Sequence, residues 1–169
     1  MSAYTQTILE ALAADVGALL LSNGQRLVTA ESCTGGWVAQ CLTSIAGSSQ
    51  WFERGFVCYS NEAKQEMLGV ESDTLRLHGA VSEAIAAAMA SGALRHSHAD
   101  WALAITGIAG PGGASTGKPV GTVCFGWAGP EGFVELETCH FSGTREDVRA
   151  HSVAHACTGL LKRATRLQG

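Results

Sequence analysis

Segments with helical and with strand periodicity alternate along this chain, and glycine-rich turns separate many of them. Apolar residues recur every three to four positions over 8–20, 37–45 and 148–161, which predicts helices there. Short β-prone runs at 26–30, 52–59 and 101–106 predict strands between the helical segments. This alternation is typical of an α/β fold in which helices cover a largely parallel sheet.

Capping residues mark the expected ends of several helices. Asn61 is a plausible N-cap for a helix that stops at Gly69, and Ser82 is one for an alanine-rich helix over 83–94. Thr144 and Asp147 have the spacing of a capping box at the start of the last helix.

A β-hairpin is expected near the end of the chain. Runs at 120–127 and 133–141 predict two strands joined through 129–132, with Glu135 and Glu137 facing outward. We therefore expect one domain over residues 1–169, a three-layer α/β/α sandwich with a mixed, mostly parallel sheet.

Charge and hydropathy exclude several classes of partner. Eleven Lys and Arg residues against fifteen Asp and Glu give a net charge of −4, so no broad basic surface for nucleic acid or anionic membranes is expected. No apolar run reaches the ~20 residues that span a bilayer, and the first residues lack the pattern of a secretory signal. We expect a soluble, cytoplasmic protein.

Cysteine and histidine spacing argues against a metal centre. The six cysteines include no C-x-x-C pair, so most are expected to be reduced and buried. His151 and His155 have helical i, i+4 spacing without an intervening H-E-x-x-H pattern, which favours surface or packing roles. We expect neither a metal ion nor a cofactor.

The first candidate site for chemistry lies where a strand ends at Glu31. Ser32 falls in the following turn, and Gly35-Gly36 let the backbone approach a ligand just before a helix begins. This arrangement suits a nucleophile beside an oxyanion hole, and a simple helix cap with glycines for tight packing is the alternative. Cys33 is a rival nucleophile, but no histidine lies within the motif to take its proton.

The second candidate lies at the end of the next strand. Tyr59 and Lys64 would reach the same edge of the sheet as Ser32 if the two strands are parallel neighbours. A lysine can take a serine proton only when it is neutral, which requires burial or nearby positive charge. A solvated lysine beside a half-buried tyrosine is the alternative.

The third candidate is a glycine-rich loop over 106–121. It contains Gly117-Lys118, but Pro119 follows and a strand comes next, so it is not a nucleotide-triphosphate P-loop. Thr106 and Gly107 could contribute substrate contacts at the strand end. Arg145, at the start of the last helix, is a reasonable phosphate ligand.

Five ordered motifs together resemble the C-terminal domain family of the competence/damage-inducible protein CinA. They are AESCTGG at 30–36, GFVCYSNEAK at 55–64, HGAVS at 78–82, GIAGP at 107–111 and FSGTR at 141–145, and the resemblance runs from about 4 to 167. Larger members carry an additional N-terminal molybdopterin-binding-like domain, for which we expect no room in this chain. Stand-alone bacterial members are nicotinamide-nucleotide amidohydrolases.

The resemblance implies hydrolysis of the carboxamide of nicotinamide mononucleotide (NMN) to nicotinate mononucleotide and ammonia, a step of pyridine nucleotide salvage. Ser32 matches the family's nucleophile, Lys64 its base, and Tyr59 the residue that assists proton transfer. The expected oxyanion and substrate contacts are Glu31, Cys33, Thr34, Gly35, Gly36, Thr106, Gly107, Ile108, Ala109, Gly110 and Arg145.

Two other functions stay open at this point. The chain could be a nucleotide-binding or regulatory module without turnover, or a Ser/Lys amidase for another small carboxamide. The expected partner is a small nucleotide substrate, and we expect the chain to bind neither nucleic acid nor a membrane. A homo-oligomer, with a dimer favoured, rests on the family resemblance.

Overall fold

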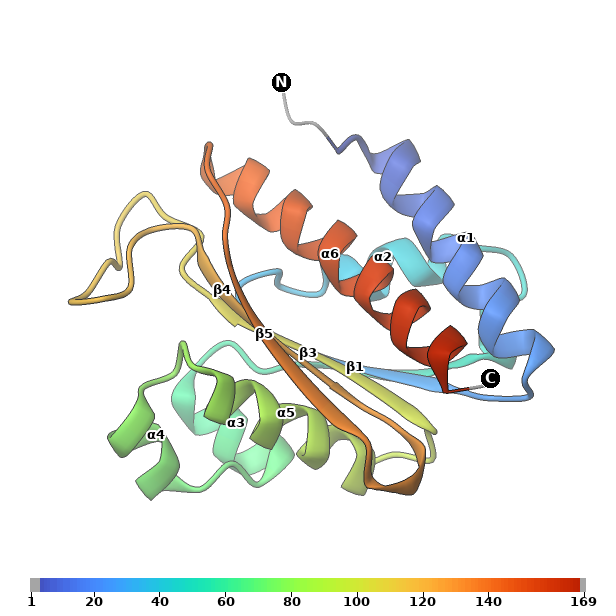
Figure 1. The fold of residues 1–169 in the computed structure, drawn as a ribbon, viewed down its shortest axis with the longest axis horizontal. Helices are drawn as coiled ribbons and strands as arrows, with labels where there is room; N and C mark the ends of the chain where they lie inside the picture. Colours follow the sequence, from blue (N-terminus) through green and yellow to red (C-terminus); the bar gives the residue numbers. More distant parts are fainter. Residues whose placement is uncertain (1–3, 168–169) are drawn as a thin grey trace.

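A five-stranded sheet with helices on both faces forms the centre of residues 4–167, the part of the chain that the computed structural model describes (Figure 1). The strands, in the order β2-β1-β3-β4-β5, are β1 (Leu27–Glu31), β2 (Phe52–Val57), β3 (Trp101–Gly107), β4 (Thr122–Ala128) and β5 (Val134–His140). The helices are α1 (Gln6–Ser22), α2 (Trp37–Thr43), α3 (Asn61–Leu68), α4 (Ser72–His78), α5 (Glu83–Arg95) and α6 (Arg145–Arg166). Short 3-10 turns lie at Ser48–Gln50 and Pro130–Gly132.

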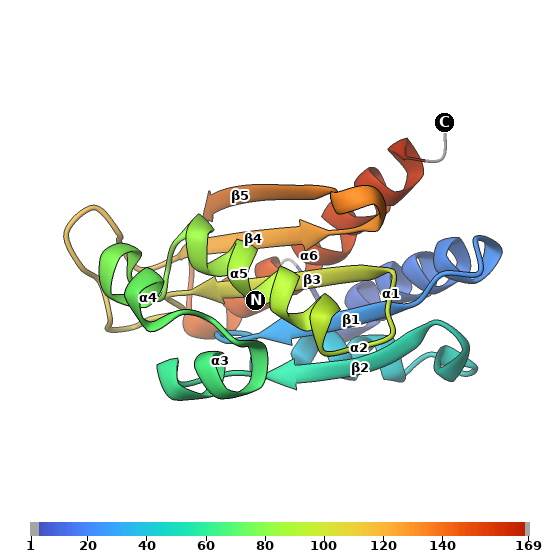
Figure 2. The same cartoon turned by 90° about the horizontal axis from the view of Figure 1, so that it is seen from below.

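The helices form two layers around the sheet. Helices α1, α2 and α6 lie on one face, and α3, α4 and α5 lie on the other (Figure 1). Figure 2 shows the five strands side by side, with α5 lying across the middle of the sheet. The predicted three-layer α/β/α sandwich is therefore confirmed.

The sheet is mixed, and one strand runs against the other four. Strand β1 pairs in parallel with β2 and β3, whereas β4 pairs antiparallel with both β3 and β5. Four strands consequently share one direction, as the predicted mostly parallel sheet requires. The pairings nevertheless divide equally into two parallel and two antiparallel ones. The carboxyl ends of β1, β2 and β3 meet at one edge of the sheet, which is where ligand sites form in α/β folds.

The core occupies both faces of the three central strands. All residues of β1 and β4 are buried, as are all residues of β3 except Gly107. The edge strands β2 and β5 are only partly buried. Trp101 and Trp127 are among the largest fully buried side chains, and both belong to the cluster beneath α1 and α6.

The predicted helix caps are largely confirmed. Ser82 accepts a hydrogen bond from the backbone of Ile85, and Thr144 and Asp147 form the reciprocal capping box. The exception is α3, where Ser60 is the N-cap and Asn61 is the first helical residue. Within residues 4–167, no helix combines the length and the apolar character that crossing a membrane requires.

The predicted outward orientation of Glu135 and Glu137 is wrong. Both carboxylates face α6, where Arg163 forms ion pairs with each of them and Arg166 pairs with Glu135. Alternation along a strand shows which residues share a face, but it does not show whether that face meets solvent or a helix. Here the face meets α6, which supplies the two cations Arg163 and Arg166.

Candidate active site

A buried carboxylate holds the turn that follows β1. Glu31 is 1% exposed; its Oε2 accepts hydrogen bonds from Thr34 Oγ1 at 2.6 Å and Val38 N at 3.0 Å, and its Oε1 accepts one from Ala39 N at 2.9 Å. The carboxylate thereby satisfies two N–H groups at the start of α2. The sequence predicts substrate contacts for Glu31 and Thr34, whereas their side chains support the turn.

The turn itself presents Ser32 at the carboxyl edge of the sheet. Ser32 N donates to Ile105 O on β3 at 3.0 Å, and Gly35 N donates to Ser32 O at 3.0 Å. Gly35 and Gly36 have φ values of 62° and 94°, in the left-handed region that favours glycine. These two glycines let the chain reverse into α2 directly beneath the serine.

Lys64 reaches Ser32 from the neighbouring element. Because β2 lies parallel to β1, the start of α3 falls beside the Ser32 turn, as expected for parallel neighbours. Lys64 is 1% exposed, and its Nζ lies 3.1 Å from Ser32 Oγ. Burial lowers the pKa of the Lys64 amine below its ordinary value, although the nearby thiols of Cys58 and Cys33 oppose the shift.

The surroundings of the Lys64 amine suit a neutral base. Lys64 Nζ donates to the carbonyl oxygens of Cys58 at 3.1 Å and Tyr59 at 3.3 Å. A neutral amine has two N–H bonds and one lone pair. When the two carbonyls accept both N–H bonds, the lone pair is left for the hydroxyl proton of Ser32.

A cleft of about 220 Å³ surrounds this pair. Of the predicted site residues, it is lined by Ser32, Cys33, Tyr59, Lys64, Thr106, Gly107, Ala109 and Arg145. Its other lining residues, which we had not placed in the site, are Asn61, Ala80 and Val81. Asn61 lies on α3 one turn before Lys64. Ala80 and Val81 belong to the HGAVS motif, which is the sequence feature that could have identified them.

The glycine-rich connection between β3 and β4 contributes Ala109 to the cleft lining and projects beyond the sheet (Figure 1). Thr106 Oγ1 donates to Ala80 O at 2.7 Å, which joins the end of β3 to the segment before α5. Ile108 N donates to Thr122 O, and Gly121 N donates to Ile108 O. Ile108 and Gly110 are therefore structural parts of this connection and do not line the cleft.

Arg145 lies at the edge of the cleft at the first position of α6. Its Nη1 donates to Gly110 O at 2.7 Å, and its Nη2 donates to the hydroxyl of Tyr59 at 2.9 Å. Tyr59 therefore contributes its carbonyl to the Lys64 amine and its hydroxyl to Arg145. Tyr59 is 60% exposed, so its ring lies open to a ligand entering the cleft.

The rival nucleophile Cys33 is poorly suited to attack. It is 6% exposed, and burial raises the pKa of its thiol to about 12. The thiolate is the reactive form of cysteine, so a thiol held this firmly protonated is inert near neutral pH. Ser32 is the better-placed nucleophile.

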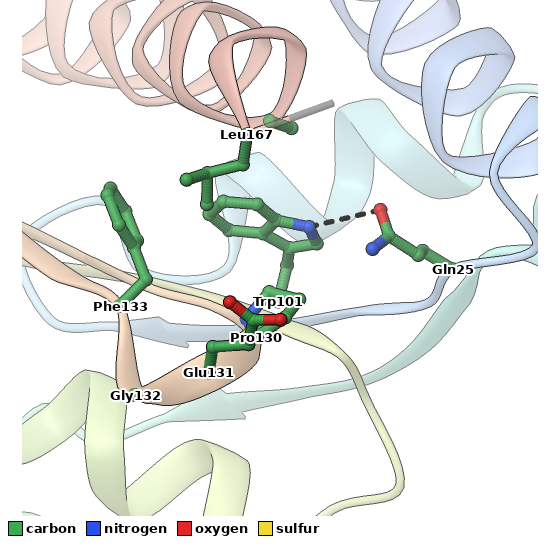
Figure 3. A pocket seen from close by; sticks show the side chains of 8 residues that line it. Gln25, Trp101, Pro130, Glu131, Gly132, Phe133 and Leu167 are labelled. Atoms are coloured by element: carbon green, nitrogen blue, oxygen red, sulfur yellow. Dashed lines mark hydrogen bonds between the residues drawn. The ribbon is translucent and has the colours of Figure 1, made fainter. Parts of the chain in front are cut away.

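A larger hollow, of about 360 Å³, lies at the opposite end of the sheet (Figure 3). Trp101 and Phe133 form much of it, and Trp101 Nε1 donates to Gln25 Oε1 at 3.2 Å. Among the described residues that line it, only Glu131 has a titratable side chain. Because it lacks a paired nucleophile and base, the smaller cleft is the candidate active site.

Comparisons with known proteins agree with the motifs and the fold. A protein of Escherichia coli K12 called nicotinamide-nucleotide amidohydrolase PncC is 53% identical over 152 residues, which cover 90% of this chain and 92% of that protein. A CinA-like protein of Syntrophobacter fumaroxidans is 52% identical over 91% of this chain, a match that covers 36% of that longer protein.

Solved structures show the same architecture. The crystal structure of the competence/damage-inducible protein CihA from Agrobacterium tumefaciens superposes with a TM-score of 0.90 at 43% identity, covering 96% of this chain and 98% of that one. The family described as the CinA C-terminal domain matches residues 9–164. The chain belongs to the CinA C-terminal domain family.

Proposed function

We propose that this chain hydrolyses the carboxamide of NMN to nicotinate mononucleotide and ammonia, with Ser32 as nucleophile and Lys64 as base. The observation that carries the proposal is the 3.1 Å contact between Ser32 Oγ and the buried Lys64 Nζ. The name of the E. coli relative supports the substrate, because a nicotinamide nucleotide contains one linear carboxamide.

Acylation comes first. Neutral Lys64 takes the hydroxyl proton of Ser32 while Oγ attacks the amide carbon, and backbone N–H groups of the turn beginning at Cys33 hold the oxyanion that forms. When the tetrahedral intermediate collapses, the C–N bond breaks and the Lys64 ammonium returns its proton to the departing nitrogen. Ammonia leaves, and the nicotinoyl group remains as an ester on Ser32.

Deacylation repeats the same proton transfers with water. Lys64 takes a proton from water as the water oxygen attacks the ester carbon, and the proton then passes to Ser32 Oγ as the ester bond breaks. Tyr59 assists in this scheme by orienting the Lys64 amine through its carbonyl. The cationic nicotinamide ring of the substrate favours the neutral form of Lys64.

The substrate phosphate is assigned to Arg145. This guanidinium is at the edge of the cleft, and it stands at the N-terminus of α6, where backbone N–H groups favour an anion. The phosphate and the reacting carboxamide are thereby kept at separate ends of the cleft, so that the anion does not raise the pKa of Lys64.

The decisive experiment measures ammonia release from NMN by Ser32→Ala and by a matched control, Ser49→Ala, which changes an exposed serine near the start of β2. We expect Ser32→Ala to lose at least ~10³-fold in kcat while the control retains it. Quenching the wild-type reaction and digesting the protein should reveal a nicotinoyl adduct on the peptide that contains Ser32. Full activity of a folded Ser32→Ala would refute the mechanism.

Two assays separate the remaining possibilities. Tight binding of NMN without ammonia release would identify a nucleotide-binding module, and faster hydrolysis of an amide lacking ribose phosphate would identify a different amidase. We further propose that the protein acts in pyridine nucleotide salvage in the cytoplasm and that it binds neither nucleic acid nor a membrane. We also propose that it forms a homodimer. Light scattering during gel filtration would test the homodimer.

A further inference from the structure

Three side chains that commonly bind metals converge between β5 and α6. Glu137 and Cys139 are two positions apart on β5 and so face the same side, and His155 meets them from α6. His155 Nε2 lies 2.7 Å from Glu137 Oε2 and 3.5 Å from Cys139 Sγ, and the three ligand atoms all lie within 4.8 Å of one another. Within residues 4–167, no other group of three His, Cys, Asp or Glu side chains converges in this way.

The distances from His155 Nε2 to the other two ligand atoms can be compared with those around a tetrahedrally coordinated ion. At a tetrahedral angle, bond lengths of about 2.3 Å to sulfur and about 2.1 Å to nitrogen or oxygen separate N from S by about 3.6 Å and N from O by about 3.4 Å. The distance of 3.5 Å from His155 Nε2 to Cys139 Sγ is already close to the first value. Glu137 Oε2 would recede by roughly 0.7 Å, within the reach of a carboxylate rotation.

Neighbouring residues hold two of the three ligands in place. The His155 ring packs against Phe125, with 4.7 Å between the ring centroids. Arg163 Nη2 donates to Glu137 Oε1 at 2.7 Å, which turns the other carboxylate oxygen toward His155. Outer groups that orient ligands in this way are a regular part of protein metal sites. The His155 and Glu137 side chains are 31% and 37% exposed, so water can reach the cluster.

We propose that Glu137, Cys139 and His155 bind one Zn²⁺ or a chemically similar divalent ion, with water as the fourth ligand. Imidazole, thiolate and carboxylate are the ligands that Zn²⁺ takes in proteins. The Cys139 thiol gives its proton to solvent when its sulfur binds the ion. Strands β3 and β4 separate this cluster from β1, so the ion would tie β5 to α6 and leave the Ser32–Lys64 pair unaffected.

Cobalt provides a direct test, because Co²⁺ bound to a thiolate gives a near-ultraviolet charge-transfer band and tetrahedral Co²⁺ gives strong visible bands. Untagged protein stripped with a chelator should take up one equivalent of Co²⁺, develop both features, and lose them when Zn²⁺ is added. Zn²⁺ should also raise the thermal unfolding midpoint of the stripped protein. Absence of a thiolate charge-transfer band in the wild type would overturn the proposal.

Variants identify the ligands. Cys139→Ser should abolish the charge-transfer band, and Glu137→Gln and His155→Phe should each weaken Co²⁺ binding at least tenfold. The matched control is Cys124→Ser, which removes a thiol from the adjacent strand on the opposite face, where Cys124 contacts Thr138. It should retain the band and the affinity.

Circular dichroism establishes that each variant is folded. If Cys139→Ser does not fold, Glu137→Gln decides, because glutamine can still accept the hydrogen bond from Arg163. A band that survives Cys139→Ser, or unchanged Co²⁺ affinity in Glu137→Gln, would refute the site.

Discussion

Glu31→Gln is the most informative single substitution, because it changes one buried atom in the support of the Ser32 turn. The glutamine keeps the shape of the side chain but replaces one carboxylate oxygen with an NH2 group. Both oxygens of Glu31 accept hydrogen bonds, so in either orientation at least one donor of the turn then faces another donor.

The structure sets the size of this effect. Loss of one hydrogen bond to a charged group costs about 1.5–3 kcal/mol, and leaving a buried donor unsatisfied adds about 1–3 kcal/mol. We therefore expect the free energy of unfolding to fall by about 2.5–6 kcal/mol. Thr34→Val removes one donor to the carboxylate without leaving a buried donor unsatisfied, and should cost about 1.5–3 kcal/mol.

Urea unfolding followed by circular dichroism measures the change. With a slope of about 2 kcal/mol per molar urea, a loss of 3 kcal/mol shifts the midpoint by about 1.5 M. The matched control is Glu66→Gln, which changes an exposed carboxylate on α3 and should alter stability by less than about 0.5 kcal/mol.

Activity provides the second readout. If the Glu31 hydrogen bonds hold Ser32 in place, kcat for ammonia release should fall at least tenfold under conditions where Glu31→Gln remains folded, because a displacement of about 1 Å can cost 10²-fold. A midpoint within about 0.3 M of the wild type, together with an unchanged kcat, would refute the positioning role of Glu31.

Further predictions concern the cleft itself. If neutral Lys64 is the base, kcat/KM should rise with pH with a midpoint below the ordinary lysine value of 10.5, and a midpoint at or above 10.5 would contradict this role. Because the pKa of Lys64 is lower in the folded than in the unfolded chain, its own contribution to stability should rise with pH between the lowered value and 10.5. Buried thiols with raised pKa values, such as Cys33 and Cys157, act in the opposite sense in this window, so the test is the difference in urea stability between the wild type and Lys64→Met, which should shift in favour of the wild type as pH rises. Cys33→Ala should retain most ammonia release, since the thiol is protonated at neutral pH, whereas a large loss would transfer the nucleophile role to sulfur. Arg145→Ala should raise KM for NMN several-fold with little change in kcat, and a pure loss of kcat would argue against phosphate binding.

Local signals predicted most of the fold. Caps such as Ser82 and the Thr144–Asp147 box involve residues three apart, so their hydrogen bonds can be inferred from sequence. The Ser32 turn was predicted from its two glycines, and its approach to Lys64 followed from a parallel pairing of β1 and β2.

Contacts between residues far apart in the chain could not be predicted. The hydroxyl of Tyr59 meets Arg145 across 86 positions, and Glu137 meets Arg163 across 26. No local periodicity encodes such contacts, because they depend on strand order and on the placement of α6. Glu31 was assigned to the substrate for a related reason: its position beside Ser32 did not reveal that its side chain points toward the start of α2.

The reversed direction of β4 determines where this fold can accept insertions near the candidate active site. A parallel neighbour is reached through a crossover connection of about a dozen or more residues, usually a helix, whereas an antiparallel neighbour can be reached through a short turn. Strand β3 instead returns directly to its antiparallel neighbour, and residues 112–117 of that connection are exposed. Each doubling of a flexible loop costs only about 0.6 kcal/mol, so insertions there would leave the sheet register intact. Evolution can therefore lengthen or replace this exposed segment, which follows the cleft-lining Ala109 in the chain, while the Ser32–Lys64 pair, built on the parallel strands, stays the same.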